Sequence, residues 1–291
     1  MTKHIIVFGG TGFIGKYIVE RLANAGYFIK IFTRNPNKAD FTNIQGCDVV
    51  INLIGILNET KQHTFQNVHV EIAKRIAKAA TIKKVPMMIH FSAMGVENNE
   101  SSKYAKSKVD GEKAVISAFP KVITIKPSIV FGKEDKFFNK FARLATILPF
   151  LPLIGGGNTK FRPVYVVDIA ELVYQIISLN KQDKKVYNVG GPQIYSFKDL
   201  IRFILKTTSR KCLLVNIPFS IGKFMAFFLE RRSIAVLFKL LTGGTEPILT
   251  RDQIILMQGN SMQPNDLVSL ITNPASIESI VPQYLKIYKK C

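Results

Sequence analysis

The chain has 291 residues, of which 47% are hydrophobic, and it carries 40 lysines and arginines against 20 aspartates and glutamates. This apolar content supports a substantial core and excludes an intrinsically disordered chain. Only three cysteines occur, at positions 47, 212 and 291. They are too few and too far apart for a disulfide framework or a zinc site, so we expect no bound metal.

The net charge of +20 is compatible with several kinds of partner. A basic surface attracts nucleic acid, an anionic membrane or an acidic protein. It can also be a lysine-rich surface with no specific partner. The sequence contains no recognised nucleic-acid module and no basic stretch interleaved with stacking aromatic residues, so we expect no nucleic-acid partner.

The apolar runs give no targeting signal. The first run, Ile5–Phe8, ends at glycines after four residues, and a later one, Cys212–Gly222, has eleven residues. A signal peptide needs a longer apolar region, and a membrane-spanning helix needs about 20 residues. We therefore expect neither a signal peptide nor a transmembrane segment.

The chain opens with the pattern of a βαβ unit. Residues His4–Phe8 form an apolar run without polar alternation, as in a strand buried on both faces of a parallel sheet. Helical spacing follows over Phe13–Ala25, and a second strand is predicted over Phe28–Thr33.

Strands and helices then alternate, which indicates an α/β fold with a Rossmann-like, doubly wound parallel sheet. The predicted strands are Val49–Ile54, Met87–Phe91, Val122–Ile125, Val164–Val167 and Val186–Val189, and the predicted helices are Phe65–Ile82, Tyr104–Ala118 and Ile169–Leu179.

The composition changes after Gly190-Gly191-Pro192. Residues 197–240 are apolar and basic in a helical pattern, with few opposing acidic residues. We therefore divide the chain into a nucleotide-binding domain at residues 1–190 and a smaller, mainly helical C-terminal lobe at residues 191–291.

A glycine-rich turn lies between the first strand and the first helix. Gly9 permits a tight turn, Gly12 lets the backbone approach a pyrophosphate, and Gly15 allows close packing of helix on sheet. The helix N-terminus offers unpaired N–H groups and the positive end of a dipole. The turn predicts a bound dinucleotide.

The end of the second strand indicates which dinucleotide binds. An acidic residue there holds the ribose hydroxyls of NAD. This chain has Thr33-Arg34-Asn35 instead, with no carboxylate before Asp40. Because Arg34 can pair a 2′-phosphate, we predict NADP(H) in preference to NAD(H).

A second group of residues has the chemistry of hydride transfer. Tyr104 and Lys108 are four residues apart and share a helix face, where the ammonium favours the phenolate. Ser92, at the end of a strand, would orient a substrate carbonyl or alcohol. We therefore predict Ser92, Tyr104 and Lys108 as orienter, acid/base and pKa-lowering cation. Lining a nucleotide pocket does not establish turnover, because Lys108 can bind ribose hydroxyls without chemistry.

The complete predicted nucleotide pocket is drawn from the glycine turn, from the ends of three further strands and from one helix. Its residues are Gly9, Thr11, Gly12, Phe13, Ile14, Gly15, Arg34, Leu53, Ile54, Gly55, Tyr104, Lys108 and Pro127. The four histidines show no metal-ligand spacing, and we interpret them as structural or surface residues.

Several segments together resemble the atypical or extended short-chain dehydrogenases/reductases. The narrower resemblance is to the dehydrogenase-like accessory subunits of respiratory complex I (alpha subcomplex subunit nine) and their bacterial homologues. It is carried by FGGTGFIGKYIVERLANAGY, DVVINLIGIL, SSKYAKSKVDGEKAVISAFP, IKPSIVFGKEDKFFNKFA, FRPVYVVDIAE and ILTRDQIILM.

The resemblance implies NADPH held as a structural cofactor, an assembly or stability role, and partners among complex I subunits. It also implies a cytoplasmic protein, peripheral to the inner or cytoplasmic membrane, whose basic lobe suits an anionic membrane surface. Two alternatives stay open: an active NADP(H)-dependent oxidoreductase or epimerase, and a scaffold that has lost nucleotide binding.

One departure from the family concerns the stretch between Thr33 and Val49. About fifteen residues leave room for one short crossover but not for an added strand with its own helix. We therefore expect the sheet to lack the usual third edge strand, together with the aspartate that the family places against adenine.

Overall fold

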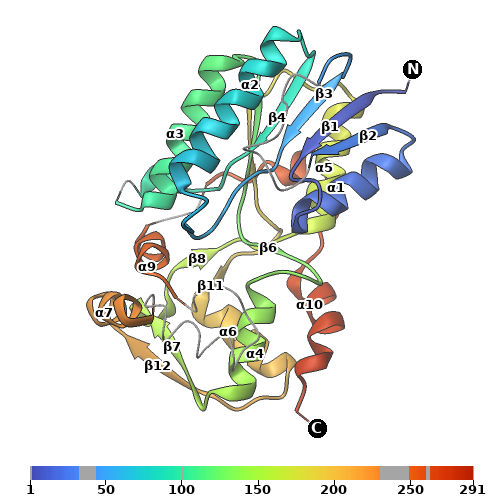
Figure 1. Cartoon of the computed structure of the whole chain (residues 1–291). Helices are drawn as coiled ribbons and strands as arrows, with labels where there is room; N and C mark the ends of the chain where they lie inside the picture. The colour runs from blue at the N-terminus through green and yellow to red at the C-terminus, as the bar shows by residue number, and fades with distance from the viewer. Residues whose placement is uncertain (1, 33–43, 100, 230–248, 260–262, 291) are drawn as a thin grey trace.

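The computed structural model describes residues 2–32, 44–99, 101–229, 249–259 and 263–290. These residues form two parts (Figure 1). A sheet with helices on both faces makes the upper part, and helices with short strands make the lower part.

The central sheet has six parallel strands in the order β10-β5-β4-β3-β1-β2. Their apolar runs are long enough to be buried on both faces, and the three middle strands β3, β4 and β5 are buried at every position. The strands are β1 His4–Phe8, β2 Phe28–Phe32, β3 Val49–Asn52, β4 Met87–Phe91, β5 Ile123–Pro127 and β10 Val186–Val189. The sheet confirms the predicted α/β fold class.

Strand β2 is the last strand on its side among the described residues, and its side chains are partly exposed. Residues 33–43 lie outside the described part of the chain. The structure therefore describes no third strand beyond β2, but it does not cover the whole stretch on which that prediction rests.

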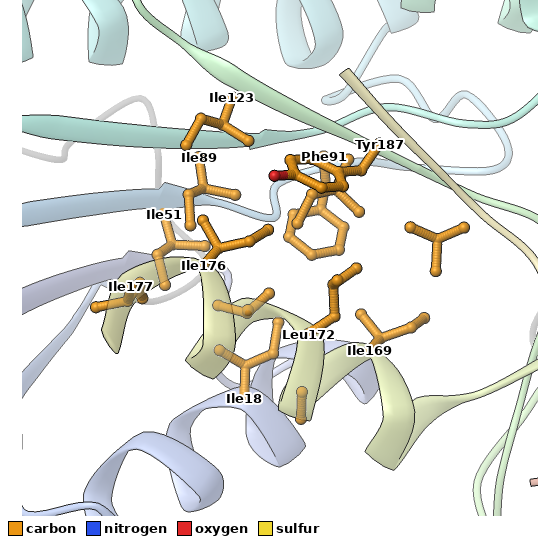
Figure 2. Close-up of a cluster of buried hydrophobic side chains, with 14 of the residues drawn as sticks. Ile18, Ile51, Ile89, Phe91, Ile123, Ile169, Leu172, Ile176, Ile177 and Tyr187 are labelled. Atoms are coloured by element: carbon orange, nitrogen blue, oxygen red, sulfur yellow. The ribbon is translucent and has the colours of Figure 1, made fainter. Parts of the chain in front are cut away.

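Two layers of helices enclose the sheet. Helices α1 (Phe13–Asn24) and α5 (Val166–Ser178) cover one face, where Ile18, Leu172 and Ile176 meet the isoleucines of the sheet (Figure 2). Helices α2 (Ala73–Ile82) and α3 (Lys103–Ala118) cover the other face. A π-helical stretch, Gln66–Ile72, leads into α2, so the predicted helix is present but its first turns are wider than α-helical.

The lower part has a core of its own. It is formed by α4 (Phe138–Ile147), α6 (Phe197–Thr207) and α10 (Ile277–Leu285), together with the parallel pair β7 (Phe150–Ile154) and β12 (Leu213–Ile217). Helices α7 (Phe219–Leu229) and α9 (Arg251–Gln258) pack beside it around Ile154 and Ile254. The division of the chain at residue 190 stays a prediction.

Two predicted elements are wrong in detail. The predicted strand Val164–Val167 is only the two-residue β9 (Val164–Tyr165), which pairs with β6 (Val130–Phe131) outside the central sheet, and its last two valines begin α5. The helical prediction for residues 197–240 missed β12, because a short, mostly apolar run fits a buried helix turn as well as a strand. Residues 230–240 of that prediction lie outside the described residues.

None of the helices that the structure describes is long and apolar enough to span a membrane.

Candidate nucleotide-binding site

The glycine turn connects β1 to α1, and two of its glycines are required by the fold. Gly9 has φ +82°, and a Cβ there would lie 3.2 Å from the carbonyl carbon of Leu53. A Cβ on Gly15 would lie 2.3 Å from the carbonyl oxygen of Gly9. These positions exclude a side chain because the turn and the neighbouring strand end pack backbone against backbone.

Gly12 is different, because its backbone does not need glycine. Its φ of −75° and ψ of 174° are extended values that any residue adopts, and its N–H donates to the carbonyl oxygen of Gly9 at 3.0 Å. Of the described atoms, a Cβ on Gly12 would meet only the Gly9 oxygen, at 3.3 Å. Thr11 and Gly12 are both exposed. The absence of a side chain here therefore leaves the start of α1 open to a ligand.

Among the described residues, no side-chain hydrogen bond caps the N-terminus of α1. Gly12 offers no capping side chain, and the first turn contains no acidic residue. The first N–H groups of a helix have no partner within the helix and attract anions. Phe13 and Ile14, which follow, are half-buried, and the Phe13 ring packs edge-on against Tyr17 at 6.0 Å.

Asn52, at the end of β3, orders the loop that faces the glycine turn. Its side-chain oxygen accepts from the N–H of Ile54 at 3.1 Å, and its amide nitrogen lies 3.1 Å from Nδ1 of His90. Burial lowers the pKa of His90 to about 3, so this imidazole is neutral. Sequence reasoning missed Asn52, although one polar residue at the end of an otherwise apolar strand was a usable signal.

His69 ties the same loop to α3. Its Nε2 accepts from the N–H of Ile56 at 3.1 Å, and its Nδ1 lies 2.8 Å from Oγ of Ser107. Ser107 uses its one hydrogen on the carbonyl oxygen of Tyr104, at 2.7 Å, so Nδ1 must donate. Burial, and then the charge of Lys108, lower the pKa of His69 to about 2. His69 is therefore a neutral structural link.

Lys108 is buried against the ends of two strands. Its ammonium lies 3.4 Å from the carbonyl oxygen of Phe91, and only 3.2 Å from where a Cβ on Gly55 would sit. Gly55 thus leaves the space that the ammonium occupies. Burial lowers the pKa of Lys108 to about 8, and the charge of Glu112 acts in the opposite direction.

Tyr104 lies on the first turn of α3 and is half-buried, with its ring edge-on to Phe65 and His69. No residue within the described part of the chain hydrogen-bonds its hydroxyl. Burial, and then the charge of Asp252, raise the pKa of Tyr104 to about 12. This direction is opposite to the one that the Tyr104–Lys108 spacing predicted, because desolvation and the charge of Asp252 both disfavour the phenolate.

Ser92 follows β4, and its side chain is 6% exposed. Its hydroxyl donates to Glu112, whose other carboxylate oxygen lies 2.9 Å from the ammonium of Lys126. The single hydroxyl hydrogen of Ser92 is therefore directed at a buried ion pair. Sequence reasoning missed Glu112 and Lys126, although Glu112 is one helical turn beyond Lys108.

The structure brings most of the predicted pocket together. Leu53 and Ile54 abut Gly9, Gly55 adjoins Lys108, and Pro127 accepts the N–H of Met94 at 3.0 Å beside the end of β4. Arg34 lies outside the described residues. Within the described part of the chain no group of three or more histidine, cysteine, aspartate or glutamate side chains is placed to hold a metal.

Comparison with known proteins supports this interpretation of the fold. Residues 5–190 match the NAD dependent epimerase/dehydratase family. The crystal structure of dTDP-4-dehydrorhamnose reductase from Bacillus anthracis in complex with NADP superposes with a TM-score of 0.66 over 99% of both chains, at 15% identity. At this identity the likeness shows the fold alone, which is an NAD(P)-binding fold.

Two relatives are similar in sequence. NADH dehydrogenase (ubiquinone) 1 alpha subcomplex subunit 9 of Mus musculus is 31% identical over 91% of this chain and 74% of its own length. The protein of the same name from Arabidopsis thaliana is 30% identical over 76% of this chain, and the match spans 61% of the plant protein. The resemblance found in the motifs is thereby confirmed: the chain belongs to the NAD dependent epimerase/dehydratase family and to the group of its relatives named alpha subcomplex subunit 9.

Proposed function

We propose that this chain is an accessory subunit of respiratory complex I that holds NADP(H) as a structural cofactor. The observation that carries the subunit role is the 31% identity to mouse subunit 9 over 91% of this chain. The NAD(P)-binding fold and the open N-terminus of α1 favour the proposal that the chain binds a nucleotide.

The residues at the site have the groups that a dinucleotide needs. The turn from Gly9 to Gly15 leaves space and backbone donors for a pyrophosphate. Lys108 has three donors, and within the described part of the chain its one hydrogen bond is a long one to Phe91, so it can also hold ribose hydroxyls. The Tyr104 hydroxyl has no hydrogen-bond partner among the described residues, so it can bind the ribose together with Lys108.

A preference for NADP(H) over NAD(H) is part of the proposal and depends on Arg34. The segment Thr33-Arg34-Asn35 has no carboxylate to hold a 2′-hydroxyl, and a guanidinium pairs a phosphate with two parallel hydrogen bonds. The support for this preference comes from the sequence alone.

One contact and one pKa shift favour a cofactor that is held without undergoing hydride transfer. When bound, the nicotinamide ring supplies hydride chemistry, and a reaction would need a free hydroxyl at Ser92 and a basic phenolate at Tyr104. The Ser92 hydrogen is directed at Glu112, and the Tyr104 pKa is raised to about 12. Ser92 is therefore poorly placed to orient a substrate, and Tyr104 is a weak source of the phenolate base.

An active oxidoreductase or epimerase is the second candidate. The observation that favours it is the Tyr104 hydroxyl, which no described residue hydrogen-bonds and which lies one helical turn from the buried Lys108. If a substrate is found, Tyr104→Phe should abolish its turnover, and unchanged turnover would rule out this mechanism.

Peripheral association with complex I or an anionic membrane is supported by charge and by exposed side chains. The chain carries a net charge of +20, and Phe224, Phe227 and Phe228 of α7 are 66%, 41% and 39% exposed. Exposed aromatic residues on one helix are characteristic of interaction surfaces.

The proposal is tested by isolating complex I from solubilised membranes of the source organism. We expect the chain to be present in the purified complex and to release NADP(H) on denaturation. A complex I preparation that lacks the chain contradicts the subunit role. If the chain is present without nucleotide, and neither NADPH nor NADH raises its melting temperature, the chain is a scaffold that has lost nucleotide binding.

A further inference from the structure

The N-terminus of α3 is held by a residue from the far end of the chain. Asp252, on α9, accepts the hydroxyl of Ser102 at 2.8 Å, the N–H of Lys103 at 2.7 Å and the N–H of Tyr104 at 3.2 Å. Ser102 in turn accepts the N–H of Ala105 at 3.0 Å. One carboxylate and one hydroxyl therefore satisfy the first donors of the helix.

This contact concerns the nucleotide pocket because α3 carries Tyr104 and Lys108. The N–H of Tyr104 is bound directly, and Lys108 lies one turn further along the same helix. A negative charge at a helix N-terminus is also favourable to the helix dipole. The position of Asp252 thus fixes the turn from which both predicted ribose contacts project.

Helix α9 is at the same time anchored to the lower part of the molecule. The Thr159 hydroxyl donates to the carbonyl oxygen of Met257 at 2.6 Å, and Ile254 is fully buried beside Ile154. On the upper side, the amide of Asn99 donates to the carbonyl oxygen of Ile255 at 2.8 Å. Figure 1 shows α9 between α3 and the lower part.

We infer that Asp252 is a positioning residue for the nucleotide site, through which the seating of α9 and the affinity for the dinucleotide are linked. Helix α7, whose aromatic residues are exposed, packs against α9, and the guanidinium of Arg251 lies 5.2 Å from the Phe227 ring. By this linkage, a bound nucleotide should hold α9 more firmly against the N-terminus of α3. The inference depends on the nucleotide binding proposed above.

The test compares NADPH affinity in the full-length chain and its variants. We expect Asp252→Ala to raise the Kd by about fivefold or more, the factor equivalent to about 1 kcal/mol of lost capping. Asp252→Asn keeps one acceptor without the charge, so its Kd for NADPH should lie between those of the unmodified chain and Asp252→Ala. If Asp252→Ala does not fold, Asp252→Asn takes its place in the comparison. Asp199→Ala is the matched control, because Asp199 is a first-turn carboxylate of α6 in the lower part of the molecule. We expect it to lower stability and leave the Kd unchanged.

Hydrogen exchange supplies a readout that a purely structural role would not change. In the unmodified chain NADPH should slow exchange at residues 103–105 and also across α9, whereas in Asp252→Ala the protection of α9 should disappear. An unchanged NADPH Kd in Asp252→Ala and Asp252→Asn overturns the linkage while leaving the nucleotide site intact. If the unmodified chain binds neither NADPH nor NADH, the proposed nucleotide site itself fails, and the linkage fails with it.

Discussion

Helices α1 and α3 both follow strands of the central sheet, yet their N-termini are treated in opposite ways. At α1 the cap is Gly12, without a side-chain acceptor and without an acidic residue in the first turn. At α3, Ser102 is the N-cap and Asp252 accepts hydrogen bonds from the first turn, although Asp252 is about 150 residues away in sequence. One helix end is closed by the protein, and the other is left open.

The difference shows where the molecule has room for an anion. A glycine in place of Ser, Thr, Asp or Asn at the N-cap costs roughly 0.3 kcal/mol of helix stability, and a nearby negative charge is worth about 0.3–1 kcal/mol. A bound phosphate would stabilise the N-terminus of α1, whereas Asp252 already stabilises the N-terminus of α3. The predictions below test whether the open end serves a ligand and whether the closed end supports it.

The largest effect is expected from Gly15→Ala in α1. The new Cβ would lie 2.3 Å from the Gly9 oxygen and 2.7 Å from the Gly10 Cα, and backbone atoms cannot move aside as a side chain can. We expect a loss of about 3 kcal/mol in the free energy of unfolding, measured by urea denaturation. Gly12→Ala is the control and should lose less than about 1 kcal/mol. Equal losses in both variants would contradict the distinction between the two glycines.

Gly12→Val should separate binding from folding. Its extended backbone accepts valine, but the side chain would stand over the open N-terminus of α1, where a pyrophosphate must approach. We expect NADPH affinity to fall by about 100-fold, equivalent to about 2.7 kcal/mol, in a calorimetric titration. The chain should still unfold cooperatively. Normal NADPH binding by this variant would mean that the site lies elsewhere.

Lys108 should make stability rise with pH in the weakly alkaline range. The unfolded chain holds this proton up to a pKa of about 10.5, whereas the folded chain releases it at about 8. Between these values the unfolded state binds more protons, so the cost of burying the charge is largest below pH 8 and decreases as the pH rises. We expect the unmodified chain to gain about 2 kcal/mol relative to Lys108→Met between pH 7 and 9.5. Denaturation curves that change in parallel for the two proteins would show that Lys108 does not carry this effect.

The smallest effect is expected from Tyr104→Phe at the closed end. No described residue hydrogen-bonds the hydroxyl, so the free energy of unfolding should stay within about 0.5 kcal/mol of the original. One lost hydrogen bond to ribose corresponds to about 1 kcal/mol, so NADPH affinity should fall by about fivefold. A hundredfold loss of NADPH affinity would show that Tyr104 contributes more to binding than one hydrogen bond.

The fold and the open helix end were predictable because their signals are local. Strands β3, β4 and β5 are short apolar runs, and the spacing of Gly9, Gly12 and Gly15 between strand and helix is read directly from the sequence. The same holds for the Tyr104–Lys108 pair, which four-residue spacing places on one helix face. These features need no knowledge of distant contacts.

The closed end was not predictable in the same way. Asp252 caps α3 across 150 residues of sequence, and nothing in the local pattern TRDQIIL points to that contact. The raised pKa of Tyr104 depends on desolvation, which is a property of the packed site and not of the spacing. Ser92 was correctly predicted at the end of a strand, but its partner Glu112 depends on how α3 lies over β4 and β5.

The most direct test is a calorimetric titration of the purified, full-length chain with NADPH and, separately, with NADH. We expect one NADPH to bind per chain, more tightly than NADH, and Gly12→Val to weaken NADPH binding by about 100-fold. No binding of either nucleotide by the unmodified chain would contradict the central claim that the open end of α1 holds a dinucleotide.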